Sequence, residues 1–158
     1  MKSYNVIMES PPLSLDDLFV IFERWKTGFD FPVHAHSEYE INFIAGAEGA
    51  VRVVGDSVEE ISDMELVLIT GSNLYHTWKN GNIKEGAGIY EVTIQFSPDL
   101  LMNGGLLDKT HFAFIRKMFQ DGHNGIAFSE QVVRKDVGVG YCCGRVDPFG
   151  GWRCHSCI

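Results

Sequence analysis

Hydrophobic and polar residues alternate in short runs along most of the first hundred residues, and Gly, Asn, Asp and Pro separate the runs. A period of two places successive side chains on opposite faces of a sheet, so each run predicts a β-strand. The separating residues favour turns. The predicted strands are residues 18–25, 36–45, 49–55, 57–62, 65–70, 75–80 and 88–97. Short strands at this spacing indicate a β-sandwich or a β-barrel.

The period of the pattern changes after Pro98. Apolar residues then recur every three or four positions, which predicts an amphipathic helix at about 108–121 that ends at Gly122. A second helix is expected to begin at Ser129, because serine is a favourable N-cap residue. The chain therefore reads as all-β with one or two helices near its C-terminal end.

Length and charge narrow the classes of protein to consider. With 158 residues, the chain is long enough for one domain with a substantial core. The net charge of −8 and the total of only 13 Lys and Arg residues argue against direct contact with nucleic acid. No apolar run reaches the roughly 18 residues that span a bilayer, and the N-terminus lacks the apolar core of a signal peptide. We expect a cytoplasmic protein.

The stretch HAHSEYEINFIA places polar side chains on one face of an expected strand. The residues that share this face include two imidazoles and two carboxylates: His34, His36, Glu38, Glu40 and Asn42. The opposite face is largely apolar, and the pattern alone does not show which face points inward. Imidazole and carboxylate groups together would ligate a divalent metal such as Zn, Ni, Fe or Mn. They would equally suit a solvated sheet face or hydrogen-bonded interior positions.

The spacing of these residues resembles a known pair of motifs. Gly28, His34, His36 and Glu40 form G-x5-H-x-H-x3-E, which resembles the first motif of the cupin superfamily. In cupins the matching histidines and glutamate bind a metal inside the barrel. The resemblance thus implies that the polar face of the strand lines the barrel interior.

The second cupin motif matches in part. His76 and Asn80 resemble its H-x3-N end, and the resemblance makes His76 a fourth metal ligand beside His34, His36 and Glu40. Cupins usually have P-x-G before this histidine, whereas here the residues are Gly71-Ser72-Asn73. The turn is therefore altered.

A wider resemblance covers about residues 18–135, which look like the N-terminal effector domain of AraC-family transcriptional regulators. It implies a cupin-type double-stranded β-helix, or jelly roll, with C-terminal helices. In that family this domain binds an effector or mediates dimerisation, and a separate pair of helix-turn-helix motifs binds DNA. No segment here combines a basic recognition helix with the required turn. We expect effector sensing without catalysis, and no DNA binding by this chain alone.

The resemblance leaves an alternative and names further candidates. The alternative is a free-standing cupin metalloenzyme, an oxygenase or isomerase, that uses the same four residues around an open metal position. As an effector we expect a small molecule such as a carbohydrate, held by hydrogen bonds and aromatic stacking. The candidates for this contact are the four metal-site residues together with Glu38, Asn42, Arg52 and Trp78.

A homodimer is the expected assembly. Phe112, Ile115 and Phe119 share one face of the helix at 108–121, because they recur at three- and four-residue spacing. The apolar positions of this helix exceed what one barrel end would cover, so we expect the three residues at a dimer contact.

The last residues differ in composition from the rest. We divide the chain into a cupin-like sensor domain at 1–135, with an N-terminal arm at 1–17 and a helical part at 108–135, and a Gly- and Cys-rich tail at 136–158. All four cysteines lie in the tail: Cys142, Cys143, Cys154 and Cys157. Their spacing would suit a structural zinc or a disulfide. The abrupt change after Lys135 makes a non-native or altered terminus the leading interpretation.

Overall fold

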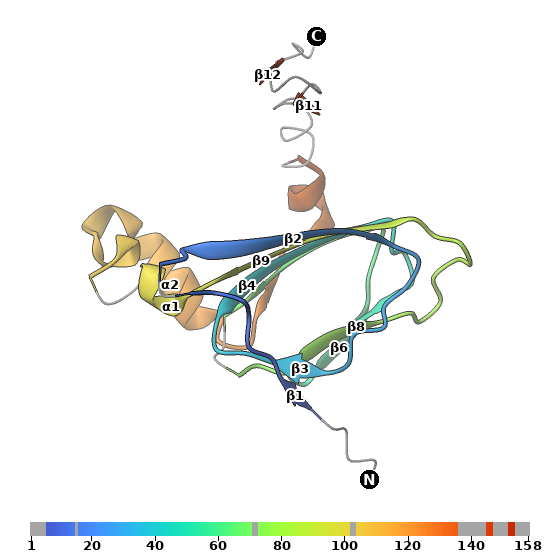
Figure 1. The fold of residues 1–158 in the computed structure, drawn as a ribbon, viewed down its shortest axis with the longest axis horizontal. Helices are drawn as coiled ribbons and strands as arrows, with labels where there is room; N and C mark the ends of the chain where they lie inside the picture. The colour runs from blue at the N-terminus through green and yellow to red at the C-terminus, as the bar shows by residue number, and fades with distance from the viewer. Residues whose placement is uncertain are drawn as a thin grey trace.

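Two five-stranded sheets facing each other form the body of the computed structural model, with helices at one end (Figure 1). The structure describes residues 6–14, 16–70, 73–101, 104–135, 145–146 and 152–153. In the first sheet the strand order is β1-β3-β8-β5-β6, and only the β1–β3 pair is parallel. Its strands are β1 (Ile7–Met8), β3 (His34–Ala35), β8 (His76–Lys79), β5 (Val51–Val54) and β6 (Ser57–Glu60).

The second sheet is antiparallel throughout, in the order β10-β7-β4-β9-β2. Its strands are β10 (Ile126–Ala127), β7 (Met64–Ile69), β4 (Tyr39–Ala45), β9 (Ile89–Phe96) and β2 (Phe19–Lys26). A separate strand pair, β11 (Arg145–Val146) and β12 (Trp152–Arg153), follows near the end of the chain. The fold is therefore rich in β-structure, as the alternating pattern predicted, and the assignment as a cupin jelly roll stays a prediction.

Each predicted strand has a counterpart, with one correction. The segment 36–45 was expected to be one strand, but β4 begins only at Tyr39, and β3 belongs to the other sheet. Residues 36–38 form a bend that carries the chain from the first sheet to the second. The strict alternation continued through this bend, so the pattern did not reveal it. The short strands β1 and β10 were also missed.

Both faces of β4 are covered, which explains why its pattern was ambiguous. Ile44 points between the sheets and packs in a core with residues from four other strands: Val54, Ile69, Trp78 and Ile89. Tyr39 and Ile41 point the other way, toward a second core that includes Phe96 and Phe119. The polar residues Glu40 and Asn42 therefore lie on the inner face, between the two sheets.

A helical segment packs against one end of the outer face of the second sheet (Figure 1). It consists of α1 (Pro98–Leu101), the 3-10 turns η1 (Leu106–Asp108) and η2 (Thr110–Phe112), and α2 (Ala113–Asp121). The expected helix at 108–121 is thus shorter, because its first residues form 3-10 turns. Within the described residues, no helix is long and apolar enough to cross a membrane.

The dimer contact expected on α2 needs correction. The ring of Phe119 is buried and lies 5.0 Å from the ring of Tyr39, centroid to centroid. Phe112 packs half-buried against the same core, and only Ile115 is exposed, at 37%. Phe112 and Phe119 therefore stabilise the chain itself. The homodimer stays a prediction that rests on Ile115.

Ser129 begins the second expected helix. Its carbonyl accepts hydrogen bonds from the N–H groups of Val132 and Val133, and residues 130–135 are helical. The side chain of Val133 is buried, so it holds this helix against the rest of the chain. The four tail cysteines lie outside the described residues, and so does the segment that directly follows Lys135. The expected domain boundary, the zinc site and the disulfide therefore stay predictions.

We predict that Phe119→Ala lowers the free energy of unfolding by about 3 kcal/mol, because it removes a buried ring from the outer core. Chemical denaturation measures this effect. Ile115→Glu is the matched variant on the exposed face, and it should leave stability nearly unchanged while giving monomers in sedimentation. A dimer that persists in Ile115→Glu would remove α2 from the dimer contact.

Candidate metal and ligand site

Four buried side chains meet where the two sheets approach each other. His34 comes from β3, His36 from the bend after it, Glu40 from β4 and His76 from β8. His34 lies directly opposite His76 in the register of β3 and β8. One nitrogen or oxygen atom from each residue lies within 4.8 Å of the others. The structure thus brings together the four residues that the cupin resemblance named, and their role as metal ligands stays a prediction.

Each histidine of this cluster is held by a backbone carbonyl through Nδ1. The acceptors are the carbonyl of Pro32 for His34, at 2.9 Å, that of Glu38 for His36, at 3.0 Å, and that of Leu74 for His76, at 2.8 Å. A ring whose Nδ1–H donates in this way presents Nε2 as a lone-pair donor. All three rings are therefore oriented as metal ligands usually are.

The spacing of the ligand atoms also suits a divalent ion. Glu40 Oε2 lies 3.1 Å from His36 Nε2 and 3.8 Å from His76 Nε2. Tetrahedral zinc with ligands at about 2.0–2.1 Å would separate them by about 3.3 Å. Among the described residues, the buried His76 Nε2 has no hydrogen-bond partner. A buried nitrogen without a partner is costly, and a metal ion would satisfy it.

The electrostatics of the cluster centre on Glu40. Burial raises the pKa of this carboxyl, but the contacts with His36 and His76 lower it more, so the net pKa is well below the usual range. Burial also opposes charge on His36, yet the hydrogen bond and charge of Glu40 outweigh it and raise the pKa of His36. For His34, burial and the nearby His76 lower the pKa to about 4. Glu40 is thus a carboxylate paired with His36 beside a neutral His34.

Two residues that the sequence interpretation missed complete the surroundings of Glu40. Gln95 lies opposite Glu40 in the register of β9 and β4, and its Nε2 donates to Glu40 Oε2 at 3.0 Å. Glu9 follows β1, and its Oε2 lies 3.7 Å from His34 Nε2. Polar residues at every second position of β9 were a usable signal for Gln95. For Glu9 the sequence held no signal, because the arm's docking depends on the fold.

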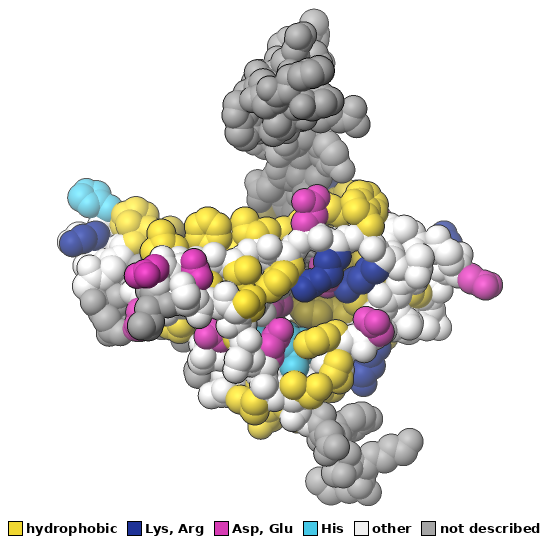
Figure 2. Space-filling view, viewed as in Figure 1, with side chains coloured by type: hydrophobic (Ala, Val, Ile, Leu, Met, Phe, Trp, Pro, Cys, Tyr) yellow, Lys and Arg dark blue, Asp and Glu magenta, His cyan; other side chains and the backbone are white. Residues whose placement is uncertain are grey.

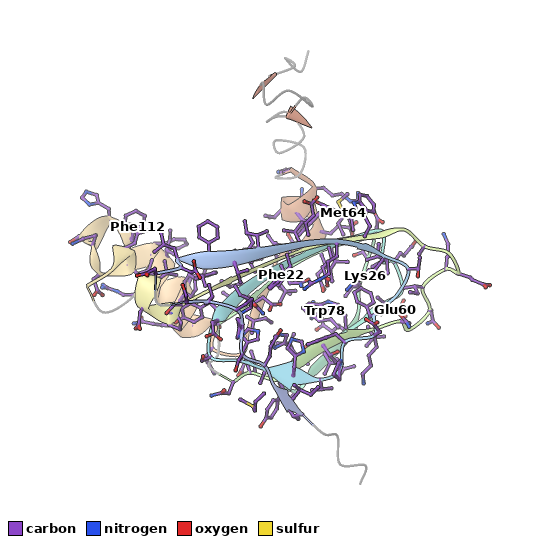
Figure 3. The ribbon with its side chains drawn as sticks, in the orientation of Figure 1. Phe22, Lys26, Glu60, Met64, Trp78 and Phe112 are labelled. Atoms are coloured by element: carbon purple, nitrogen blue, oxygen red, sulfur yellow. The ribbon has the colours of Figure 1, made fainter. Side chains whose placement is uncertain are left out.

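A cavity of about 170 Å³ lies between the sheets beside the cluster. His34, Glu40, Asn42 and Trp78 line it, and their expected contact with a ligand stays a prediction. The remaining lining residues include three more from β9 and three from β2: Glu91, Thr93, Gln95, Phe22, Arg24 and Lys26. Figure 3 shows Phe22 and Lys26 pointing from β2 into the space toward Trp78. His36 and His76 belong to the cluster and do not line the cavity.

Two expected ligand contacts have other partners. Arg52 forms ion pairs with the carboxylates of Glu59 and Glu65, and Trp78 Nε1 donates to Glu65 Oε1 at 2.9 Å. Burial raises the pKa of Glu65 in spite of these contacts. Glu38 Oε1 accepts a hydrogen bond from Ser37 Oγ at 3.0 Å. Arg52 and Glu38 do not line the cavity, and their contact with a ligand stays a prediction.

The remaining motif residues position the loops around the site. The N–H of Phe29 donates to Asn80 Oδ1 at 2.6 Å, and a Cβ on Gly28 would lie only 2.9 Å from this oxygen. The two motifs therefore meet through Gly28 and Asn80. Asn73, where cupins have glycine, takes a left-handed backbone with φ of 61°. Asparagine tolerates this conformation, so the altered turn still leads to His76.

Comparisons with known proteins give only distant similarity. No family model and no curated protein matches the chain. A structure of ToxT from Vibrio cholerae is 11% identical, with a TM-score of 0.46, over 78% of this chain and 47% of that one. A structure of ToxT from Vibrio cholerae O395 bound to (E)-4-(8-methylnaphthalen-1-yl)but-3-enoic acid is 11% identical, with a TM-score of 0.43, over 79% and 49%. The chain spans about half the length of these structures, and similarity this low carries no functional conclusion.

We predict that Gly28→Ala lowers the free energy of unfolding by about 1 kcal/mol, because the new Cβ displaces the Asn80 amide from the N–H of Phe29. Asn80→Ala should lower the free energy of unfolding by a similar amount. In the double variant the two losses should not add, since there is no Asn80 side chain left to displace. Denaturant titration of the four proteins completes the cycle, and full additivity would show that the two residues act independently.

Proposed function

We propose that the chain is the effector-sensing and dimerisation domain of an AraC-family transcriptional regulator, and that it binds a small polar molecule between its two sheets without a catalytic step. DNA contact would then come from a helix-turn-helix part outside this chain. The cavity beside the cluster supports binding of a small ligand. Its volume of about 170 Å³ is below the roughly 300–1,000 Å³ of sites for drug-sized ligands, so it suits a smaller molecule.

The observation that carries the proposal is a pair of buried acceptors at the cavity. Asn42 Nδ2 donates to Thr93 Oγ1 at 3.0 Å, but Asn42 Oδ1 has no partner among the described residues. Gln95 Oε1 is likewise buried without one. Buried polar atoms are ordinarily hydrogen-bonded. A ligand that donates hydrogen bonds, such as a hydroxylated molecule, would satisfy both.

The N-terminal arm links the cavity to the outside of the domain. The N–H of Glu9 donates to the carbonyl of Ala35 at 2.9 Å, and its side chain lines the cavity. A ligand that contacts Glu9 would favour the docked arm over other arrangements, because it binds that arrangement more tightly. Such a shift in population is how we expect the domain to report its effector.

A metal-dependent enzyme is the second candidate function, and the four-residue cluster is the observation that favours it. His34, His36 and His76 would hold the ion through Nε2 and Glu40 through Oε2, with Gln95 orienting the carboxylate. A bound divalent ion would supply Lewis acidity at the edge of the cavity. The sensor and the enzyme share this site, and they differ in whether a bound ligand is converted.

We predict that at least one member of a panel of sugars, polyols and sugar acids raises the melting temperature of the protein, because a ligand of the native state stabilises it. Asn42→Leu should abolish this shift. Asn82→Leu is the matched control, since Asn82 is exposed, its side-chain amide donates to Glu60, and it does not line the cavity. A shift that survives Asn42→Leu would place the ligand elsewhere, and recovery of a chemically changed ligand would favour the enzyme.

We predict that freshly purified protein contains about one divalent metal per chain and that His36→Ala loses most of it, because the substitution removes a ligand whose geometry is already set. Elemental analysis measures the content. The paired variant Cys154→Ser with Cys157→Ser should keep its metal. The reverse result, with metal retained in His36→Ala and lost from the cysteine variant, would assign the ion to the tail.

A further inference from the structure

The inner face of β2 brings two cations to one end of the cavity. Lys26 Nζ lies 2.8 Å and Arg24 Nη1 3.5 Å from the same oxygen, Glu91 Oε2. The Glu91 side chain is only 8% exposed, whereas that of Arg24 is 47% exposed and that of Lys26 22%. Figure 2 shows Lys and Arg side chains gathered near the centre of the molecular face in view, with a histidine visible below them. Among the described residues, one carboxylate pairs with two cations, so one positive charge has no carboxylate of its own there.

Aromatic rings hold both cations at this end. The Arg24 guanidinium lies 4.7 Å from the centroid of the Phe22 ring, and Lys26 Nζ lies 4.4 Å from that of Phe29. A cation over an aromatic face is stabilised and partly shielded from water. Arginine and lysine also carry more N–H donors than one carboxylate oxygen can accept. The pair is therefore positioned to bind a further anion.

The other carboxylates at the cavity do not neutralise this charge. Glu40 is paired with His36, and Glu9 lies beside His34 and Gln95. Asp30 also lines the cavity but is exposed to solvent. Among the described residues, Glu91 is the only carboxylate that forms an ion pair with the two cations, which leaves room for an anionic ligand at their end.

The polar residues of β9 form a row that leads inward from these cations. Arg24 lies opposite Glu91, and Asn42 lies opposite Thr93 two residues further on. Gln95, two residues beyond, is the last member of the row. Strand geometry separates alternate residues by about 7 Å. One such step from Glu91 reaches the level of Asn42, and two steps reach Gln95. A molecule with one end on the cations would therefore extend along this row toward the acceptors of Asn42 and Gln95.

We propose that the ligand of this cavity is a small hydroxy acid of the size of an aldonic or uronic acid. Its carboxylate binds Arg24 and Lys26, and its hydroxyl groups donate to Asn42 Oδ1 and Gln95 Oε1. This inference rests on the proposed effector-binding function and names the chemical class of the effector. A neutral sugar would leave the extra positive charge unpaired, and a plain fatty acid would leave the buried acceptors unpaired, at a cost in each case.

The test compares five compounds by thermal shift and calorimetry: D-gluconate, D-galacturonate, D-glucose, D-galactose and hexanoate. We expect at least one of the two hydroxy acids to bind at least tenfold more tightly than its neutral parent and than hexanoate, and the preference to weaken as salt is raised. Arg24→Gln and Lys26→Gln should each remove the preference for the acid. Lys84→Gln is the matched control, because the Lys84 side chain is 88% exposed and does not line the cavity.

The possible outcomes separate this inference from the proposed function. Equal or tighter binding of the neutral sugars would overturn the hydroxy acid and leave a sensing cavity. Binding of hexanoate as tight as that of gluconate would show that the hydroxyl groups contribute nothing, which also overturns it. If none of the five binds while another member of the broader panel does, the class is wrong and the sensor stands. Circular dichroism of each variant confirms that the fold is retained.

Discussion

The burial of Glu40 between three imidazoles is the interaction on which the rest of the structure depends. A carboxylate loses a large hydration energy when it leaves water, and it is tolerated only with charged or hydrogen-bonding partners. Here Gln95 donates to it directly, His36 Nε2 lies 3.1 Å from its Oε2, and backbone carbonyls hold His34, His36 and His76 in place. Two of these histidines belong to strands of the first sheet and Glu40 to the second, so the cluster joins the two sheets at one end.

A second buried ionic group joins the sheets elsewhere in the interior. Arg52 on β5 pairs with Glu65 on β7, and Trp78 on β8 donates to the same carboxylate. Hydrophobic residues fill the interior near Ile44. The polar groups fix the position of one sheet relative to the other, because a shift of either sheet would separate a buried charge from its partner. The cavity remains where polar side chains from both layers face each other.

Strand parity and motif spacing predicted features that depend on residues close in the sequence. They did not predict contacts between residues that only the fold brings together. The alternation from His34 to Asn42 grouped His34, His36, Glu40 and Asn42, which are all buried, and the cupin resemblance of His76 pointed to the same cluster. The change of sheet at residues 36–38 escaped the pattern because alternation continued through it. Phe119 was assigned to a dimer contact because helical spacing shows that residues share a face but does not show what covers that face.

The residues that sequence reasoning missed define the chemistry of the cavity. Arg24 and Lys26 alternate with exposed residues on β2, and the sequence interpretation did not single them out. Only the pairing of β2 with β9 sets them against Glu91. Gln95 contacts Glu40 through Nε2, while its Oε1 has no partner within the part of the chain that the structure describes, so the same amide lies at both the cluster and the ligand space. Occupation of the cluster by a metal would therefore alter the position of Gln95, and with it the affinity of the cavity. By thermodynamic linkage, a ligand held by Gln95 would change the affinity of the cluster for metal by the same factor.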